Sequence, residues 1–171
     1  MQDDRNLEKT YRSAVSGLYA RIRSYYDYLI RKYGNEGFEI IAEMSREYGF
    51  SIAERAKKKL ANNDLASVSQ YLIRIFNTVG WGRNLTEYIE SGPTRTVIKA
   101  TECPLHFNNP AMCIAHTTME KTVVETLNPK LIYRIGKSIP AGDSYCEHII
   151  EVLEAEDKSS GTEEAKSRTT G

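Results

Sequence analysis

The sequence predicts an α+β protein in which a helical amino-terminal half packs with a small antiparallel sheet and one further helix. Two patterns support this class. Apolar residues recur every three or four positions as far as about residue 80, which is typical of amphipathic helices. Beyond that point, short segments rich in β-branched residues flank a single helical stretch, which is typical of strands.

Three helices are expected in the first half. A long apolar stripe marks the first, and the segment 34–37, which holds two glycines, ends it. The residues of this stripe are Leu7, Tyr11, Ala14, Leu18, Ile22, Tyr25 and Leu29. A second helix carries Phe38 and Ile41 on one side, and Gly49 is expected to break or kink it. A third helix runs over residues 65–79 after a polar segment, 62–64, that is typical of a helix start.

The second half is expected to contain four strands and a helix. Segments 85–91 and 94–101 predict a hairpin around Gly92-Pro93. Asn109-Pro110 marks the start of a helix over 110–127, and strands are expected over 131–138 and 145–153. We therefore expect one domain over 1–154, with a helical part at 1–80 and the sheet and helix at 81–154. Residues 155–171 are polar and are expected to form a disordered tail.

Composition excludes several classes of protein. The 171 residues include 23 basic and 23 acidic side chains, whereas nucleic-acid-binding proteins normally carry a basic excess. No apolar run approaches the ~18 residues of a transmembrane helix, and the polar start of the chain shows no secretory signal. Three cysteines is an odd number, and a chain of this length needs no disulfide staples. A reducing cytoplasm, with thiols free or metal-bound, is the expected environment.

All three cysteines and all three histidines lie between Cys103 and His148 and form pairs: Cys103 with His106, Cys113 with His116, and Cys146 with His148. Thiolate and imidazole suit nucleophilic chemistry near neutral pH and the binding of borderline metals. Packing alone would scatter such residues, so their segregation predicts one site.

The central pair lies on the predicted helix. Cys113, His116 and Glu120 follow one another along one helical face. This order suits a catalytic arrangement in which Cys113 is the nucleophile, His116 the base and Glu120 the carboxylate that orients the imidazole. On the following strand Cys146 and His148 point to the same face, and Cys146 would approach Cys113 if that face packs on the helix.

Metal binding is the second interpretation of the same residues. A zinc or iron ion would be held by members of one set, namely Cys103, Cys113, Cys146, His116 and His148. No spacing matches a zinc finger or ribbon, and each cysteine taken alone fits an ordinary buried residue. Whether a metal is bound therefore stays open at the level of sequence.

Short motifs resemble a known family. The segments 101–104 and 139–146, the latter Ile-Pro-Ala-Gly-Asp-Ser-Tyr-Cys, with Cys113 between them, resemble the L-2-amino-thiazoline-4-carboxylate hydrolase-like family. The closing Gly-Asp-x-x-Cys element is also similar to that of 4-vinyl reductase-type ligand-binding domains. The resemblance implies helices packed on an antiparallel sheet, cysteines near a small-molecule pocket, and hydrolysis of a cyclic amidine that contains sulfur. Only Cys103, Cys113, Gly142, Asp143 and Cys146 match these motifs.

Three hypotheses follow. The first is a small-molecule hydrolase acting on a C–N or C–S bond, with Cys103, His106 and Asp143 completing the pocket and Asp143 shaping the turn that presents Cys146. The second is a vinyl-reductase-like domain that binds or senses a small molecule and uses its cysteines to hold a structural metal. The third assigns the long apolar stripe to a homodimer through the amino-terminal helices. None of them involves nucleic acid or a membrane.

Overall fold

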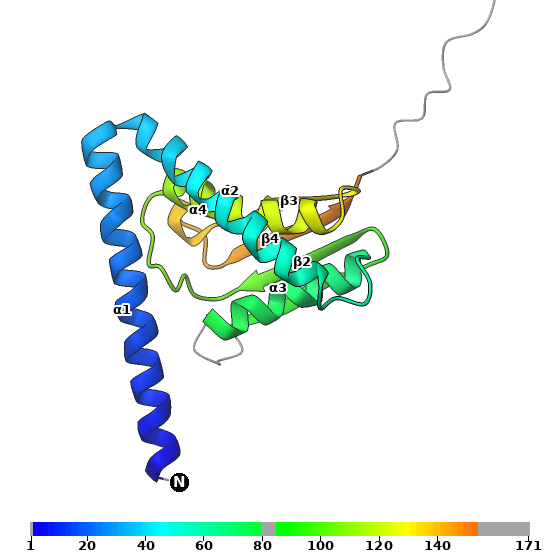
Figure 1. Ribbon diagram of the computed structural model, residues 1–171, viewed down its shortest axis with the longest axis horizontal. Coiled ribbons are helices and arrows are strands. Elements are labelled where there is room, and N and C mark those ends of the chain that lie inside the picture. The colour runs from blue at the N-terminus through cyan, green and yellow to red at the C-terminus, as the bar shows by residue number, and fades with distance from the viewer. Residues whose placement is uncertain (1, 80–84, 154–171) are drawn as a thin grey trace, which may run out of the picture.

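The computed structural model describes residues 2–79 and 85–153 and confirms the α+β class. The described elements, in chain order, are α1 (Gln2–Tyr33), α2 (Asn35–Lys57), α3 (Leu65–Val79), β1 (Thr86–Ser91), β2 (Arg95–Ala100), α4 (Pro110–Leu127), β3 (Leu131–Ile135), the 3-10 helix η1 (Ile139–Ala141) and β4 (Cys146–Val152). The strands form one antiparallel sheet in the order β1-β2-β4-β3, of which Figure 1 labels β2, β4 and β3. The predicted tail at 155–171 lies outside the described residues.

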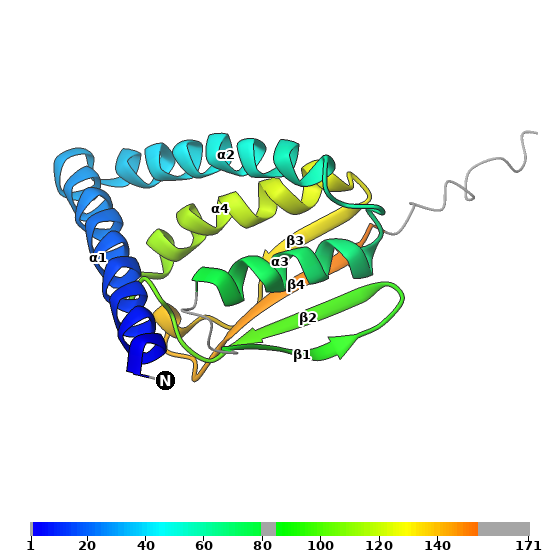
Figure 2. The ribbon, with the colours of Figure 1, turned by 60° about the horizontal axis from the view of Figure 1, so that its bottom comes forward.

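Helices α3 and α4 lie over one face of the sheet, α2 packs on α4, and α1 stands at one end of these layers (Figure 2). The main core lies between the sheet and α3 and α4. Ile98 of β2 and Ile150 of β4 are fully buried there. Cys146 and His148 precede Ile150 at steps of two, so they face the same helices, as the alternation of the strand predicts.

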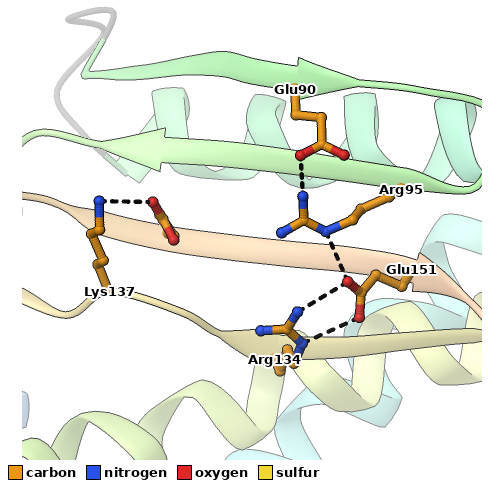
Figure 3. A network of polar contacts seen from close by, with 6 residues as sticks. Glu90, Arg95, Arg134, Lys137 and Glu151 are labelled. Atoms are coloured by element: carbon orange, nitrogen blue, oxygen red, sulfur yellow. Dashed lines mark hydrogen bonds and ion pairs between the residues drawn. The ribbon is translucent and has the colours of Figure 1, made fainter.

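The outer face of the sheet carries a row of charged side chains that crosses all four strands (Figure 3). Glu151 on β4 accepts hydrogen bonds from Arg95 on β2 at 2.8 Å and from Arg134 on β3 at 3.0 Å. Arg95 also pairs with Glu90 on β1. Charged pairs of this kind keep one face of an antiparallel sheet polar while the opposite face packs on helices.

Local signals in the sequence set two of the helix starts. Asn109 accepts a hydrogen bond from the Ala111 amide at 2.9 Å, and Pro110 occupies the first turn of α4. Asp64 accepts one from the Ser67 amide at 2.8 Å at the start of α3. Both starts were predicted from these side chains.

The expectation that Gly49 breaks the second helix is wrong. Helix α2 continues without interruption from Asn35 to Lys57. A Cβ atom at Gly49 would lie 2.7 Å from the Met119 carbonyl oxygen and 2.8 Å from Cβ of Thr122, both on α4. The glycine therefore allows two helices to approach closely, and the surrounding packing overrides its low helix propensity.

Helix α1 has a buried side and an exposed side. Tyr19 and Tyr26 are buried against the rest of the protein, whereas Leu7, Leu18 and Tyr25 are more than half exposed, at 71%, 54% and 58%. The predicted apolar stripe is thus partly uncovered, and the homodimer through α1 stays a prediction. In the described part of the chain no helix, α1 included, is long and apolar enough to cross a membrane.

Candidate ligand-binding site

A cavity of about 570 Å³ lies among α1, α2, α3, the start of α4 and the adjoining ends of β2 and β4. Its described lining is mainly apolar and aromatic. Aromatic residues from four parts of the fold contribute: Tyr11, Tyr19, Tyr25, Tyr26, Tyr48, Phe76 and Phe107. A volume of this size and an apolar lining with a few polar groups are typical of small-molecule sites. The cavity is therefore the candidate functional site.

The structure brings all three cysteines to this cavity. Cys103 contributes from the loop after β2, Cys113 from α4 and Cys146 from β4. All three thiols are free. The Ser138 hydroxyl donates to Cys113 Sγ at 3.9 Å, and the Ile139 amide donates to Cys146 Sγ at 3.3 Å. Residues that are far apart in the sequence thus line one space.

The environment of Cys113 does not activate its thiol. Burial raises the pKa of Cys113 to about 11, and the other nearby acidic groups act in the same direction. The predicted base, His116, is hydrogen-bonded to another residue: its Nδ1 atom lies 3.0 Å from the Tyr26 hydroxyl oxygen. Burial lowers the pKa of His116 to about 4, so its ring is neutral at pH 7 and offers no positive charge to a thiolate. These contacts give no support to a Cys113-His116 nucleophile, which stays a prediction from the sequence.

This environment predicts slow alkylation of Cys113. With a pKa of about 11, on the order of one thiol in ten thousand is ionised at pH 7. Iodoacetamide should label Cys113 slowly in the folded protein and rapidly in denaturant, as measured by peptide mass spectrometry. Fast labelling of the folded protein at about pH 6 would instead reveal an activated thiolate and restore the nucleophile hypothesis.

His148 also lines the cavity and is also neutral. Its Nδ1 atom lies 2.6 Å from the Tyr133 hydroxyl, and its ring lies 4.4 Å from that of Phe76, measured between centroids. Burial lowers the pKa of His148 to about 4 and raises the pKa of Tyr133 well above its ordinary value. The two histidines thus hold tyrosine hydroxyls in place and carry no charge.

The described residues do not arrange a metal site. Among residues 2–79 and 85–153, no group of three or more His, Cys, Asp or Glu side chains could hold a metal ion. The predicted ligand set therefore gains no support, although all five of its members line one cavity: Cys103, Cys113, Cys146, His116 and His148. Zinc or iron binding stays a prediction from the sequence.

Two predicted pocket residues lie apart from the described lining. His106 is exposed, has φ of 50°, and its amide donates to the Cys103 carbonyl at 3.0 Å. Asp143 accepts a hydrogen bond from the Ser138 amide at 2.8 Å. That bond shapes the turn before Cys146, which is the structural part of the role predicted for Asp143.

Glu120 is the most unusual group in the cavity wall. Its side chain is buried, and its Oε2 atom has no hydrogen-bond partner in the part of the chain that the structure describes. Burial raises the pKa of Glu120 to about 7. Since buried carboxyl groups are normally paired, an unpartnered one that faces a cavity indicates a place for a polar group of a ligand.

Charge in the described lining is acidic. Glu120 and the exposed Glu102 contribute carboxyl groups, and no Lys or Arg is among the lining residues that the structure describes. A bound carboxylate or phosphate would therefore meet like charge and find no cationic partner. Neutral or cationic ligands are favoured.

The tyrosines of α1 and the α2 residues of the lining were not predicted as site residues. Tyrosine at helical spacing is a common packing residue, so each one gives only a weak signal. Their concentration was the available signal, because seven of the eleven tyrosines lie within the first 48 residues.

Comparisons with known proteins support the fold. No family model matches the chain, and no curated protein matches it, so the resemblance to the hydrolase-like family is not supported. Among solved structures, the phenol-responsive sensory domain of the transcription activator PoxR, bound to phenol, is similar over 84% of this chain and 77% of that domain, with a TM-score of 0.58 and 15% identity.

A second solved structure is subunit 3 of the trafficking protein particle complex from Naegleria fowleri, covalently bound to palmitic acid. It is similar over 85% of this chain and 97% of its own, with a TM-score of 0.57 and 12% identity. At such low identity the likeness shows the fold alone. The class is therefore an α+β fold that a small-molecule-binding sensory domain and a trafficking-complex subunit share with this chain.

Proposed function

We propose that this protein is a small-molecule-binding domain that holds a predominantly apolar ligand in the cavity between α1 and α4. The observation that carries the proposal is the cavity itself, about 570 Å³ with a largely apolar and aromatic described lining. Burial of an apolar ligand in such a space removes its surface from water, which is the main source of affinity. Two proteins of the same fold bind phenol and palmitic acid, which supports a ligand-binding use of the fold.

The site favours binding over hydrolysis. The pKa of Cys113 is raised to about 11 by burial, and neutral His116 is bonded to Tyr26. The thiazoline substrate implied by the family resemblance also carries a carboxylate, for which the described lining offers no Lys or Arg. Hydrolysis of a C–N or C–S bond therefore stays a hypothesis that no specific contact favours.

The proposal can be tested with Nile red, a neutral apolar dye whose fluorescence increases in an apolar environment from which water is excluded. We expect saturable binding to the wild-type protein. Ser45 lies on α2, is buried and lines the cavity, so the Ser45→Phe variant should fill part of the space and weaken dye binding at least about tenfold.

Glu47→Phe is the matched control, because Glu47 lies on the same helix, is exposed and does not line the cavity. It adds the same ring to the surface and should leave dye binding unchanged. Equal loss in both variants, or no saturable binding by wild type, would refute the proposal. Circular dichroism confirms that each variant is folded.

A further inference from the structure

The wall of the cavity, which is rich in aromatic residues, holds a buried carboxyl group with one oxygen atom that lacks a described hydrogen-bond partner. Glu120 is only 6% exposed, and its Oε2 atom lacks a hydrogen-bond partner among residues 2–79 and 85–153. Leaving a buried carboxylate without a partner is costly, since its hydration is lost and nothing replaces it. A structural carboxyl would normally be paired with a cation or with several donors. The missing partner is thus a feature that a ligand can supply.

No lining residue that the structure describes brings a Lys or Arg charge to Glu120. Tyr19 and Tyr26 of α1, Cys113 on its own helix and Tyr133 of β3 all sense its charge, and all are acids. The imidazoles of the lining, His116 of α4 and His148 of β4, are bonded to tyrosine hydroxyls.

The aromatic rings that line the same cavity as this carboxyl suit a cation as well. Tyr26 stacks on Phe107 with a centroid separation of 6.1 Å, and Tyr19, Phe76 and Tyr48 also line the cavity. Faces of tyrosine and phenylalanine rings attract ammonium groups, and the attraction strengthens when the cation is desolvated. A carboxyl beside several rings is therefore complementary to an ammonium group on an apolar body.

We infer that the ligand is an organic amine, whose ammonium group pairs with Glu120 while its apolar part fills the aromatic cavity. This inference rests on the proposed function and names its ligand class. An ammonium group compensates the buried carboxylate by a charge-assisted hydrogen bond, which a neutral hydroxyl does less strongly. A carboxylate ligand is disfavoured by repulsion from Glu120, because no Lys or Arg is in the described lining.

Three probes with the same ring test the inference: benzylamine, benzyl alcohol and benzoate, titrated by calorimetry at about pH 8, where benzylamine is a cation and a carboxyl of raised pKa is ionised. Wild type should bind benzylamine at least about tenfold more tightly than benzyl alcohol, and benzoate most weakly. Glu120→Gln should remove the preference for the amine, and circular dichroism checks that this variant is folded. Glu47→Gln, which removes an exposed carboxyl of α2, should keep the preference.

The outcomes separate this inference from the proposed function. If Nile red binds in a Ser45-dependent way but wild type prefers benzyl alcohol or shows no preference, the amine assignment is overturned and the binding function stands. The assignment is also overturned if Glu120→Gln keeps the preference. If the wild-type protein shows no saturable binding of Nile red, the binding function itself is contradicted. If it also fails to bind benzylamine, the amine assignment is overturned too.

Discussion

The Glu120→Gln variant should be more stable than the wild type at pH 8 by up to about 3 kcal/mol, and the difference should vanish near pH 4.5. Burial raises the pKa of Glu120 from its ordinary value of 4.5 to about 7. The folded state therefore holds the proton more tightly than the unfolded state. The stabilisation that comes from this protonated carboxyl is fully present below pH 4.5 and is lost as the pH rises through 7. Each tenfold difference in proton affinity between the folded and unfolded states corresponds to about 1.4 kcal/mol.

Urea denaturation of both proteins between about pH 4.5 and 8 measures this difference. His116 and His148 have pKa values lowered to about 4, so their stabilising contribution is present above pH 6.5 and is lost toward pH 4. Both proteins carry these histidines, and the subtraction removes their effect. A difference that does not change with pH would show that the Glu120 carboxyl is not desolvated.

This expected gain in stability bears on function. A buried acidic group that weakens the fold at neutral pH is a typical feature of a functional site. Residues there are selected for binding a ligand, and the folded protein is less stable as a result. The same variant should thus be more stable and lose its preference for amines. Variants elsewhere in the core would not link these two effects.

Gly49→Ala should destabilise the protein by about 1 to 3 kcal/mol, although alanine is the better helix former. The added methyl group would lie 2.7 Å from the Met119 carbonyl oxygen and 2.8 Å from Thr122 Cβ. Both contacts are too short, and one is with backbone, so α2 and α4 would have to move apart. Urea denaturation measures the loss, and Nile red binding should weaken because α2 forms part of the cavity wall.

Gly17→Ala provides the matched control. Gly17 lies within α1, and a Cβ atom there would meet nothing within 4 Å. The same substitution should therefore raise the free energy of unfolding by about 0.5 to 1 kcal/mol through helix propensity alone. If Gly49→Ala also stabilised the protein, the close approach of α2 to α4 would be refuted.

Much of the fold could be predicted because its signals are local. The polar caps Asp64 and Asn109 act on amides two or three residues away, so their helix starts are visible in the sequence. Alternation placed Cys146 and His148 on one face of a strand for the same reason. The expectation that Gly49 breaks a helix failed because its neighbours on α4 are seventy residues away in the chain.

The candidate site was predicted only in part. Segregation of cysteine and histidine pointed to the region that forms one wall of the cavity, and Cys103, Cys113, Cys146, His116 and Glu120 do line it. Their chemistry was not predictable, because a pKa depends on burial and on partners from other elements. His116 illustrates this, since its partner Tyr26 is contributed by α1.

The sequence by itself determined the α+β class, the order of the helices and strands, and the part of the chain in which the cysteines and histidines lie. Only the tertiary structure decided that α1 and its tyrosines close the cavity, that His116 and His148 are neutral, and that Glu120 Oε2 lacks a hydrogen-bond partner among the described residues. The reason is physical. Helix and strand patterns arise from neighbours along the chain, whereas desolvation and hydrogen bonding at a site depend on which distant segments pack around it.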